Sequence, residues 1–232
     1  MNIDITRENV MNNRSITDSK VKRNTKTFEK NSPYIVVKRI TDVLLSLLGL
    51  VVLSPVFIII AIAIKLESKG PVFFKHTRIG KGGKIIKIYK FRSMVENAEE
   101  LIKEFTPEQM KEYKENYKLS NDPRITKVGK ILRKTSLDEL PQLINILKGE
   151  LSIIGPRPVV EEELKKYGKN IGKFLSVTPG LTGYWAANGR SCTSYEQRMQ
   201  MELYYIDNLS FKMDVKVFFK TIEAVIKREG AI

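Results

Sequence analysis

The sequence is poor in cysteine and histidine, the side chains on which most zinc sites are built. Its 232 residues include one cysteine, Cys192, and one histidine, His76. A single cysteine excludes an internal disulfide framework and a cysteine-based zinc site. A single histidine argues against a histidine-based zinc site or a centre built from several histidines. Any chemistry must therefore come from carboxylates, lysine, arginine, hydroxyls and the backbone.

Negative charge is also scarce. The chain carries 40 Lys and Arg against 26 Asp and Glu, which gives a formal net charge of +14. This excess predicts an anionic partner, either nucleic acid, a phosphorylated ligand or a membrane surface. No helix-turn-helix, RNP or other nucleic-acid reader pattern occurs, and we therefore expect no nucleic-acid partner. Hydrophobic residues make up 42% of the chain, enough for one folded domain.

Charge is absent altogether from Val43 to Ile64, a run of 22 residues. As a straight helix this run would be roughly 33 Å long, which matches the hydrocarbon thickness of a bilayer. A buried core helix and a cleaved signal peptide are the alternatives. A core helix of a small domain is seldom apolar all round, and a signal peptide has a shorter apolar run nearer the N-terminus. The run therefore predicts insertion into a membrane.

The middle of this run contains Ser54 and Pro55. Proline removes a backbone donor and clashes with the preceding turn, so the helix should bend there. Both flanks are basic: Lys38 and Arg39 precede the run, and residues 65–92 hold nine Lys and Arg but one acidic residue. The positive-inside rule places both flanks in the cytoplasm. A re-entrant helix bent at Ser54-Pro55 satisfies that rule, whereas a straight span does not.

These features predict a mainly helical α+β fold in one membrane-associated domain. We divide the chain into a disordered or flexible arm (1–33), a re-entrant membrane helix (34–69) and a domain on the cytosolic face (70–232), which would carry any catalytic site. Two short strands, 72–74 and 85–89, flank a glycine-rich turn and predict a β-hairpin. Helices are predicted at 93–118 with a break at Thr106-Pro107, 137–148, 161–167, 194–208 and 211–229. The last is amphipathic and basic, so it either packs on the core or lies on an anionic membrane surface.

The strongest candidate site is the segment Ser136-Leu137-Asp138-Glu139-Leu140-Pro141. Pro141 fits best in the first turn of a helix, which places Asp138 or Ser136 near the N-cap. A purely structural interpretation is available, because Ser136 and Glu139 match a capping box. The catalytic interpretation uses the same geometry. A helix N-terminus keeps a carboxylate ionised, an ionised aspartate can attack phosphorus, and a neighbouring glutamate can hold Mg²⁺.

Three arginines are candidates for binding the anion. Arg157 lies between two prolines in Gly155-Pro156-Arg157-Pro158, a rigid loop suited to bidentate phosphate binding. Arg133 lies five residues before Asp138, and Arg190 follows an Asn-Gly turn. The turn from Thr178 to Gly183 carries no chemical group of its own, and we expect it to shape a pocket wall.

Seven segments in a fixed order carry a resemblance: Arg78-Ile79-Gly80, Lys90-Phe91-Arg92-Ser93-Met94, Asp122-Pro123-Arg124-Ile125-Thr126, Leu132 to Leu143, Gly155-Pro156-Arg157-Pro158, Thr178 to Gly183 and Asn188-Gly189-Arg190. With them the chain resembles the bacterial sugar transferase family, the monotopic polyprenyl-phosphate phosphoglycosyl transferases, in its short catalytic-domain form. The resemblance runs from about Pro33 to the C-terminus. A non-catalytic membrane scaffold is the alternative.

The resemblance implies a chemistry and a site. Asp138 and Glu139 form a catalytic dyad that holds Mg²⁺. Asp138 attacks the sugar-bearing phosphate of a UDP-sugar, UMP leaves, and undecaprenyl phosphate takes the phosphosugar from the aspartyl intermediate. Phosphate contacts are implied for five cationic side chains: Lys90, Arg92, Arg133, Arg157 and Arg190.

The resemblance also implies a place in the cell and a pathway. The enzyme would lie on the cytoplasmic face of the bacterial cytoplasmic membrane, against anionic phospholipid, and perform the first membrane step of polysaccharide or glycoconjugate assembly. The departures from the family pattern are His76 where glutamine is common, the pair Ser191-Cys192, and Phe211 where tryptophan is usual. None touches the dyad, so they bear only on the choice of sugar.

Overall fold

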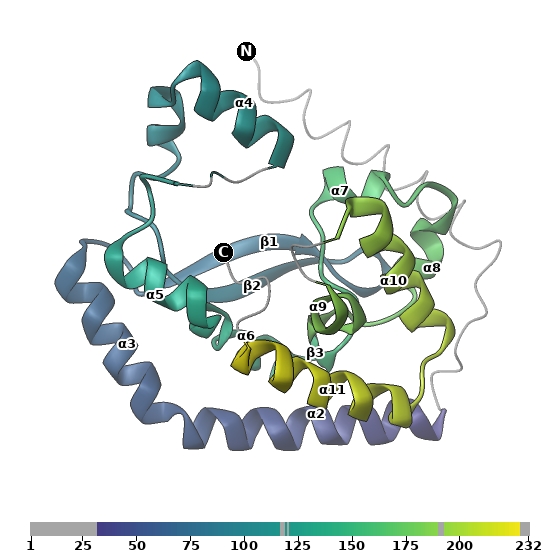
Figure 1. Ribbon diagram of the computed structural model, residues 1–232. Helices are drawn as coiled ribbons and strands as arrows, with labels where there is room; N and C mark the ends of the chain where they lie inside the picture. The colour runs from purple at the N-terminus through teal and green to yellow at the C-terminus, as the bar shows by residue number, and fades with distance from the viewer. Residues whose placement is uncertain (1–31, 117–118, 120, 190–192, 228–232) are drawn as a thin grey trace, which may run out of the picture.

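The computed structural model describes residues 32–116, 119, 121–189 and 193–227. The predicted arm therefore lies outside the described residues up to position 31. Helices dominate, with two small two-stranded sheets, which confirms the α+β prediction (Figure 1). The elements are α2 (Pro33–Val52), α3 (Ser54–Glu67), β1 (Phe73–Ile79), β2 (Ile85–Phe91), α4 (Pro107–Asn116), α5 (Lys127–Thr135), α6 (Gln142–Lys148), β3 (Ser152–Ile154), α7 (Glu161–Lys165), α8 (Ile171–Leu175), β4 (Gly180–Thr182), α9 (Tyr184–Asn188), α10 (Tyr195–Asp207) and α11 (Phe211–Ile226).

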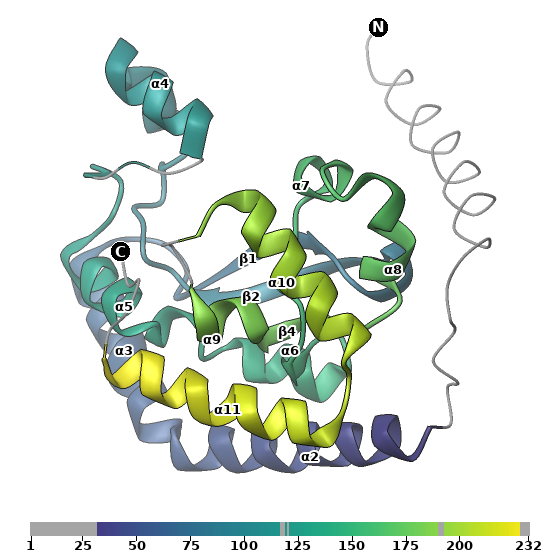
Figure 2. The same cartoon turned by 45° about the vertical axis from the view of Figure 1, so that its right-hand side comes forward.

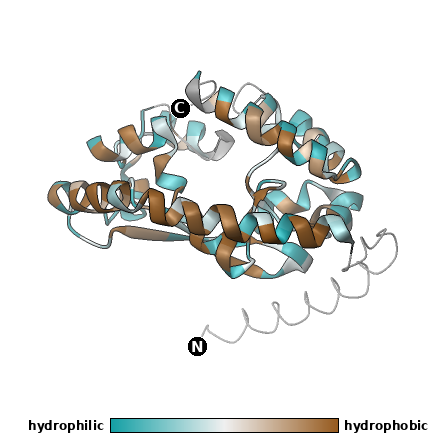
Figure 3. Cartoon of the chain, turned by 90° about the horizontal axis from the view of Figure 1, so that it is seen from below, coloured by the Kyte–Doolittle hydropathy of each residue, from teal (hydrophilic) through white to brown (hydrophobic). Residues whose placement is uncertain are grey.

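The apolar run forms two helices that meet at Leu53. α2 and α3 differ in direction by 60°, and the Ser54 hydroxyl donates to the Val51 carbonyl at 2.8 Å. The predicted break at Ser54-Pro55 is therefore confirmed. Within the described residues no single helix is long and apolar enough to cross a membrane, while this bent pair meets the length and composition of a span when taken together. Seen from below, both helices present a largely hydrophobic surface (Figure 3).

The polar side of α2 binds the rest of the domain. Arg39 donates to the carbonyls of Ile146 (2.6 Å) and Leu147 (2.8 Å), which lie in the last turn of α6. This is the place where a helix dipole favours a cation. One turn further along α2, the buried Asp42 accepts the backbone N–H of Ile153 in β3 at 2.9 Å. The polar side of α2 therefore faces the domain, which leaves its apolar side exposed.

The start of α2 is joined to α11 through Asp214. This carboxylate accepts Tyr34 Oη at 2.9 Å and Lys38 Nζ at 2.7 Å from α2. It also accepts the buried Tyr205 hydroxyl of α10 at 2.6 Å. The contacts hold α11 alongside α2, as two views of the chain show (Figures 1 and 2).

The far end of α3 is joined to α5. The Glu67 carboxylate accepts the backbone N–H groups of Lys127 (2.6 Å) and Val128 (2.9 Å). These are the first two residues of α5, where helix N–H groups have no partner within the helix. The bent pair thus contacts α6 near one end and α5 near the other.

The predicted hairpin is confirmed and is longer than expected. β1 and β2 pair antiparallel from Phe73 opposite Phe91 to Ile79 opposite Ile85. Gly82 turns the chain at φ 67°, a conformation that favours glycine. The parallel pair β3–β4 was not predicted. Each strand has three residues, too few to show an alternating pattern.

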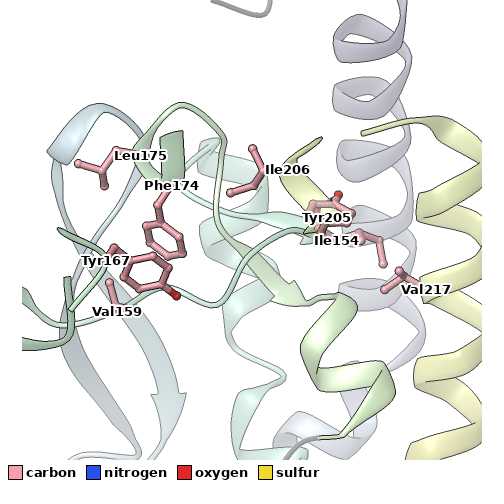
Figure 4. Close-up of a cluster of buried hydrophobic side chains, with 8 residues drawn as sticks. All are labelled: Ile154, Val159, Tyr167, Phe174, Leu175, Tyr205, Ile206 and Val217. Atoms are coloured by element: carbon pink, nitrogen blue, oxygen red, sulfur yellow. Dashed lines mark hydrogen bonds between the residues drawn. The ribbon is translucent and has the colours of Figure 1, made fainter. Parts of the chain in front are cut away.

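The largest hydrophobic cluster lies between the β3 end of the domain and the C-terminal helices (Figure 4). The rings of Tyr167 and Phe174 are in contact, with centroids 4.2 Å apart and planes tilted by 37°. The other buried members are Ile154, Val159, Leu175, Tyr205, Ile206 and Val217. Because Val217 belongs to this cluster, α11 packs on the core with one side, as one of the two sequence interpretations expected.

Asn145 fixes α6 to the hairpin. Its side chain is fully buried; Oδ1 accepts Tyr89 N–H at 2.9 Å, and Nδ2 donates to the Lys87 carbonyl at 2.8 Å and to Glu150 at 2.6 Å. We expect Asn145→Ala to lower the free energy of unfolding by about 2–4 kcal/mol, because it leaves buried backbone groups unpaired. Denaturant titration of the two proteins measures this. The exposed Asn97→Ala is the control, and equal stability of both variants would contradict the assignment.

Candidate active site

The dyad lies on a separate turn between α5 and α6. α5 ends at Thr135, Ser136 adopts a left-handed conformation (φ 58°), and Leu137–Glu139 form one 3-10 turn before α6 begins at Gln142. The single helix predicted for 137–148 is therefore wrong in its first five residues. Left-handed residues are rare outside glycine and end helices, so Ser136 separates the two.

The capping box offered as the structural interpretation does not form. The Ser136 side chain makes no capping hydrogen bond in this turn. The Glu139 carboxylate lies instead against β2, where Lys90 Nζ is 2.6 Å from its Oε1. Lys90 Nζ is also 3.8 Å from Asp138 Oδ2. One lysine therefore serves both carboxylates of the dyad.

Asp138 is largely buried, with 8% of its surface exposed. Burial raises the pKa of its carboxyl, and Lys90 opposes that rise, while Glu139 adds to it and Arg133 lowers it. Arg133 itself is mostly buried near the end of α5, with Nε donating to Ser93 Oγ at 2.9 Å. Burial lowers the pKa of Arg133, and among its neighbours Asp138 opposes this most strongly. The two cations keep this buried carboxyl closer to its ionised form.

A pocket opens beside the dyad. Lys90, Glu139 and Arg157 line it together, so the structure brings these three predicted site residues to one place. The whole lining is His76, Arg78, Ile88, Lys90, Glu139, Gln142, Arg157, Pro158, Gly180 and Leu181. Cations that converge beside two carboxylates are the kind of arrangement that binds phosphate groups in phosphoryl transfer.

The remaining predicted phosphate contacts are Arg92 and Arg190. Arg92 is buried and donates to the carbonyl and hydroxyl of Ser68, both at 2.9 Å, and to the carbonyl of Lys69. These contacts place its guanidinium at the end of α3, where it joins β2 to the helix pair. Arg190 lies outside the described residues. The prediction for each as a phosphate contact stays a prediction.

The sequence interpretation did not include His76 and Arg78 among the site residues. The hairpin register supplies the missing signal, because Phe74 lies opposite Lys90 and His76 opposite Ile88. Directly opposed residues share one face of a sheet, as do residues two apart along a strand. His76 and Arg78 therefore share the face of Lys90, and a predicted register would have identified them.

Glycines let the pocket wall come close to the Arg157 loop. A Cβ on Gly180 would lie 2.1 Å from the backbone N of Gly155, and one on Gly183 would lie 2.1 Å from its carbonyl oxygen. No side chain larger than hydrogen fits at either position. Because Gly180 and Leu181 line the pocket, the prediction that residues 178–183 shape a wall is confirmed.

Glu202 supports the Arg157 loop from beneath. Its carboxyl group is fully buried, and Oε1 accepts the backbone N–H of Arg157 at 3.0 Å. Oε2 has no hydrogen-bond partner within the described part of the chain. Burial raises the pKa of Glu202 to about 7, although the Arg157 N–H and the nearby Arg198 oppose this.

This raised pKa predicts a pH-dependent stability. Between about pH 4.5 and 7 the unfolded chain releases a proton that the folded protein retains, so the free energy of unfolding falls as pH rises through that window. Glu202→Gln keeps an acceptor for Arg157 and cannot titrate. We expect the difference in free energy of unfolding between the variant and the parent to be about 1–3 kcal/mol more favourable to the variant at pH 8 than at pH 5. Chemical unfolding at both pH values measures this; Glu196→Gln, exposed on the same helix, is the control. A pH-independent difference would contradict the prediction.

The dyad fits a metal ion that is shared with the substrate. Within the described residues there is no group of three or more His, Cys, Asp or Glu side chains that could hold a metal. Asp138 and Glu139 offer two carboxylates, which is too few for a resident zinc site. Mg²⁺ is commonly held by one or two carboxylates, with water and substrate phosphates completing its ligands. The donor set therefore fits Mg²⁺ that enters with a phosphorylated substrate.

Comparison with known proteins shows the family to which the chain is similar. The bacterial sugar transferase family pattern matches residues 33–228. The exopolysaccharide production protein ExoY of Sinorhizobium fredii is 45% identical over 197 residues, which cover 84% of this chain and 87% of ExoY. The undecaprenyl-phosphate galactose phosphotransferase of Salmonella typhimurium and the UDP-galactose-lipid carrier transferase of Erwinia amylovora are each 41% identical over 198 residues, 84% of this chain.

The chain belongs to the bacterial sugar transferase family. The family prediction is thereby confirmed, and with it the prediction that the protein is an enzyme. The chain spans 41% of the length of the Salmonella and Erwinia relatives, against 87% of ExoY.

Proposed function

We propose that the protein transfers a phosphosugar from a UDP-sugar to undecaprenyl phosphate, giving undecaprenyl-diphospho-sugar and UMP. The observation that carries this proposal is the Asp138–Glu139 dyad, in contact with Lys90 and beside a pocket that contains Arg157. The names of the Salmonella and Erwinia relatives, a phosphotransferase acting on undecaprenyl phosphate and a UDP-galactose-lipid carrier transferase, support the two substrates. ExoY, named for exopolysaccharide production, supports a role at the start of polysaccharide assembly.

The chemistry has two displacements at one phosphorus atom. A carboxylate oxygen of Asp138 bonds to the sugar-bearing phosphorus of the UDP-sugar, while the bond to the bridging oxygen breaks and UMP leaves with the electron pair. A phosphate oxygen of undecaprenyl phosphate then attacks the same phosphorus and releases the Asp138 carboxylate. Two charge-neutralising cations, Lys90 and Arg133, lie near the carboxylate throughout.

The side chains of the site have separate roles. Lys90 favours the ionised form of Asp138 and holds the Glu139 carboxylate on the pocket side. Asp138 and Glu139 would hold Mg²⁺, which supplies charge neutralisation on the phosphates when bound. Arg157, fixed by Glu202 through its backbone, presents a guanidinium to the pocket.

Exposed apolar surface supports a location at the membrane. Large hydrophobic side chains are exposed along the bent helix pair and on α11, whose start lies beside that of α2. They include Val36, Val37, Ile40, Leu44, Leu48, Val51, Val52, Ile59, Ile62, Leu66, Phe211, Val215, Phe218, Phe219 and Ile222. A patch of this size marks an interaction surface. We place the helix pair as a re-entrant insertion, with α11 on anionic phospholipid and the catalytic domain on the cytoplasmic face.

The experiment that tests the activity is direct. The full chain, purified in detergent or nanodiscs, is mixed with undecaprenyl phosphate, Mg²⁺ and a panel of UDP-sugars. UMP release over many turnovers that requires both substrates is the expected result, because without undecaprenyl phosphate each protein molecule can release UMP once. Absence of UMP with every sugar in the panel, from protein that is folded, would contradict the proposed function.

The re-entrant topology makes a separate prediction about labelling. In a Cys192→Ser background, Ser32→Cys and Lys69→Cys lie at opposite ends of the helix pair, outside its apolar part. Both should react with a membrane-impermeant maleimide in inverted vesicles and neither in intact spheroplasts, because both ends lie on one face. Val52→Cys, beside the bend, should be protected in both and is the control. Labelling of the two end positions from opposite sides would mean that the pair spans the membrane.

A further inference from the structure

Arg78 and Arg157 lie together in the pocket without a carboxylate partner. Both line it, and no acidic side chain of the described residues forms an ion pair with either. Two carboxylates whose charges act on Arg78 form ion pairs with other cations, Glu139 with Lys90 at 2.6 Å and Glu163 with Arg198 at 3.2 Å. Burial, followed by the neighbouring Arg157, lowers the pKa of Arg78 to about 10. Arg78 is half-buried and Arg157 is exposed, and two cations that line one pocket repel each other unless an anion joins them.

His76 orients one of these arginines. Arg78 Nη1 lies 2.7 Å from His76 Nε2. A guanidinium can only donate, so Nε2 accepts and the ring proton is on Nδ1. The histidine must be neutral for this contact. Burial, helped by Arg78, Lys90 and Arg157, lowers the pKa of His76 to about 4, which keeps it neutral at physiological pH.

The two ends of the pocket carry different groups. Lys90 lies opposite Phe74 and Arg78 opposite Ile86, so the two cations start four residue pairs apart on one face of the hairpin. That separation is roughly 13 Å between backbones. Both side chains line the pocket, and Lys90 is the one that contacts the dyad. A ligand with two phosphates can therefore meet a separate cation at each.

We propose that Arg78 and Arg157 bind the nucleoside-side phosphate of the substrate, the one that leaves with UMP, and that His76 is the positioning residue that aims Arg78 at it. This rests on the proposed function, because that function puts the sugar-side phosphorus at Asp138. The next phosphate then lies toward Arg78. The pair neutralises the anion that remains on the leaving nucleotide.

Nucleotide binding by the full chain tests the assignment without turnover. Calorimetric titration measures the affinities of UMP, UDP and uridine for the parent protein and for each variant in nanodiscs. Arg78→Gln should weaken the binding of UMP and of UDP by a similar factor of at least ten, and it should leave the binding of uridine unchanged. Lys75→Gln, exposed on the other face of the same strand, removes an equal charge and should bind all three normally. If Arg78→Gln does not fold, Arg78→Lys takes its place, and loss of the planar fork should weaken UMP several-fold.

The histidine has its own pair of variants. His76→Gln keeps a neutral acceptor and should bind UMP within about three-fold of the parent, whereas His76→Phe keeps the ring shape without an acceptor and should weaken UMP about ten-fold. A purely structural role would not separate these two. The inference fails if Arg78→Gln or Arg78→Lys binds UMP like the parent, if UDP alone is weakened, or if the two His76 variants behave alike. The proposed function fails separately, when the parent protein releases no UMP.

Discussion

Asp138→Asn should reduce UMP release by at least about a thousand-fold, with the protein folded and membrane-bound as before. Asparagine fills the same volume on the turn between α5 and α6 but has no anionic oxygen to attack phosphorus. The loss should be in turnover, because the cations that bind the phosphates remain in place. Even a large defect leaves some catalysis from binding alone, so a small residual rate is expected.

A trapped intermediate makes the test of Asp138 more specific. With a UDP-sugar labelled in the sugar, the parent protein should retain label through denaturation when undecaprenyl phosphate is omitted, and Asp138→Asn should not. Asp207→Asn, an exposed aspartate paired with Lys173, is the matched control and should behave like the parent. Normal turnover by Asp138→Asn would remove the nucleophile assignment, whatever the labelling shows.

Lys90→Met should lower the rate at neutral pH by about a hundred-fold, the usual cost of losing one charged group aimed at the reacting centre. Burial already raises the pKa of Asp138, and Lys90 is the largest influence that opposes it. Without the ammonium group the pKa of Asp138 rises further, so a smaller fraction of the carboxyl is ionised at pH 7. Glu139 also loses its 2.6 Å partner.

The sign of this effect shows in the pH profile. Activity needs ionised Asp138, so the acidic limb of kcat/KM rises with pH through the pKa of that carboxyl. In Lys90→Met the limb should move to higher pH, and part of the lost rate should return in alkaline buffer. Lys87→Met removes an exposed lysine three residues earlier on the same strand and should leave the limb in place. An unmoved limb in Lys90→Met would mean that Lys90 does not tune Asp138.

Features with a strong local signal could be predicted from the sequence. The bend at Ser54-Pro55, the hairpin around its glycine turn, the capping box of Ser194 with Gln197 and the break before Pro107 all follow from residues adjacent in the chain. The helix predicted at 93–118 is wrong before that break, where the chain forms turns and a 3-10 helix at Glu100–Glu104. The dyad region and the Arg157 loop were also found, since proline and paired carboxylates stand out. Each of these depends on backbone chemistry within one or two turns.

The remainder depends on contacts between distant segments. Lys38 and Arg39 were interpreted as membrane-flank charges, yet one binds Asp214 and the other binds the end of α6. Ser136 looked like an N-cap, but its left-handed conformation ends α5 instead. Arg78 and Arg157 come together because the two strands pair in one register and the glycines let the loops approach. None of these contacts leaves a periodic pattern.

The attachment of the bent helix pair has a mechanical consequence. α2 holds α6 through Arg39 and α3 holds α5 through Glu67, and Asp138 is on the turn that joins α5 to α6. The turn that carries Asp138 therefore bridges the two arms of a helix pair that is bent by 60°. A change in this bend would move α5 and α6, the two helices on either side of Asp138, together. With the helix pair inserted as proposed, the bend should respond to hydrocarbon thickness, and the turnover rate should then vary with lipid chain length at constant headgroup charge.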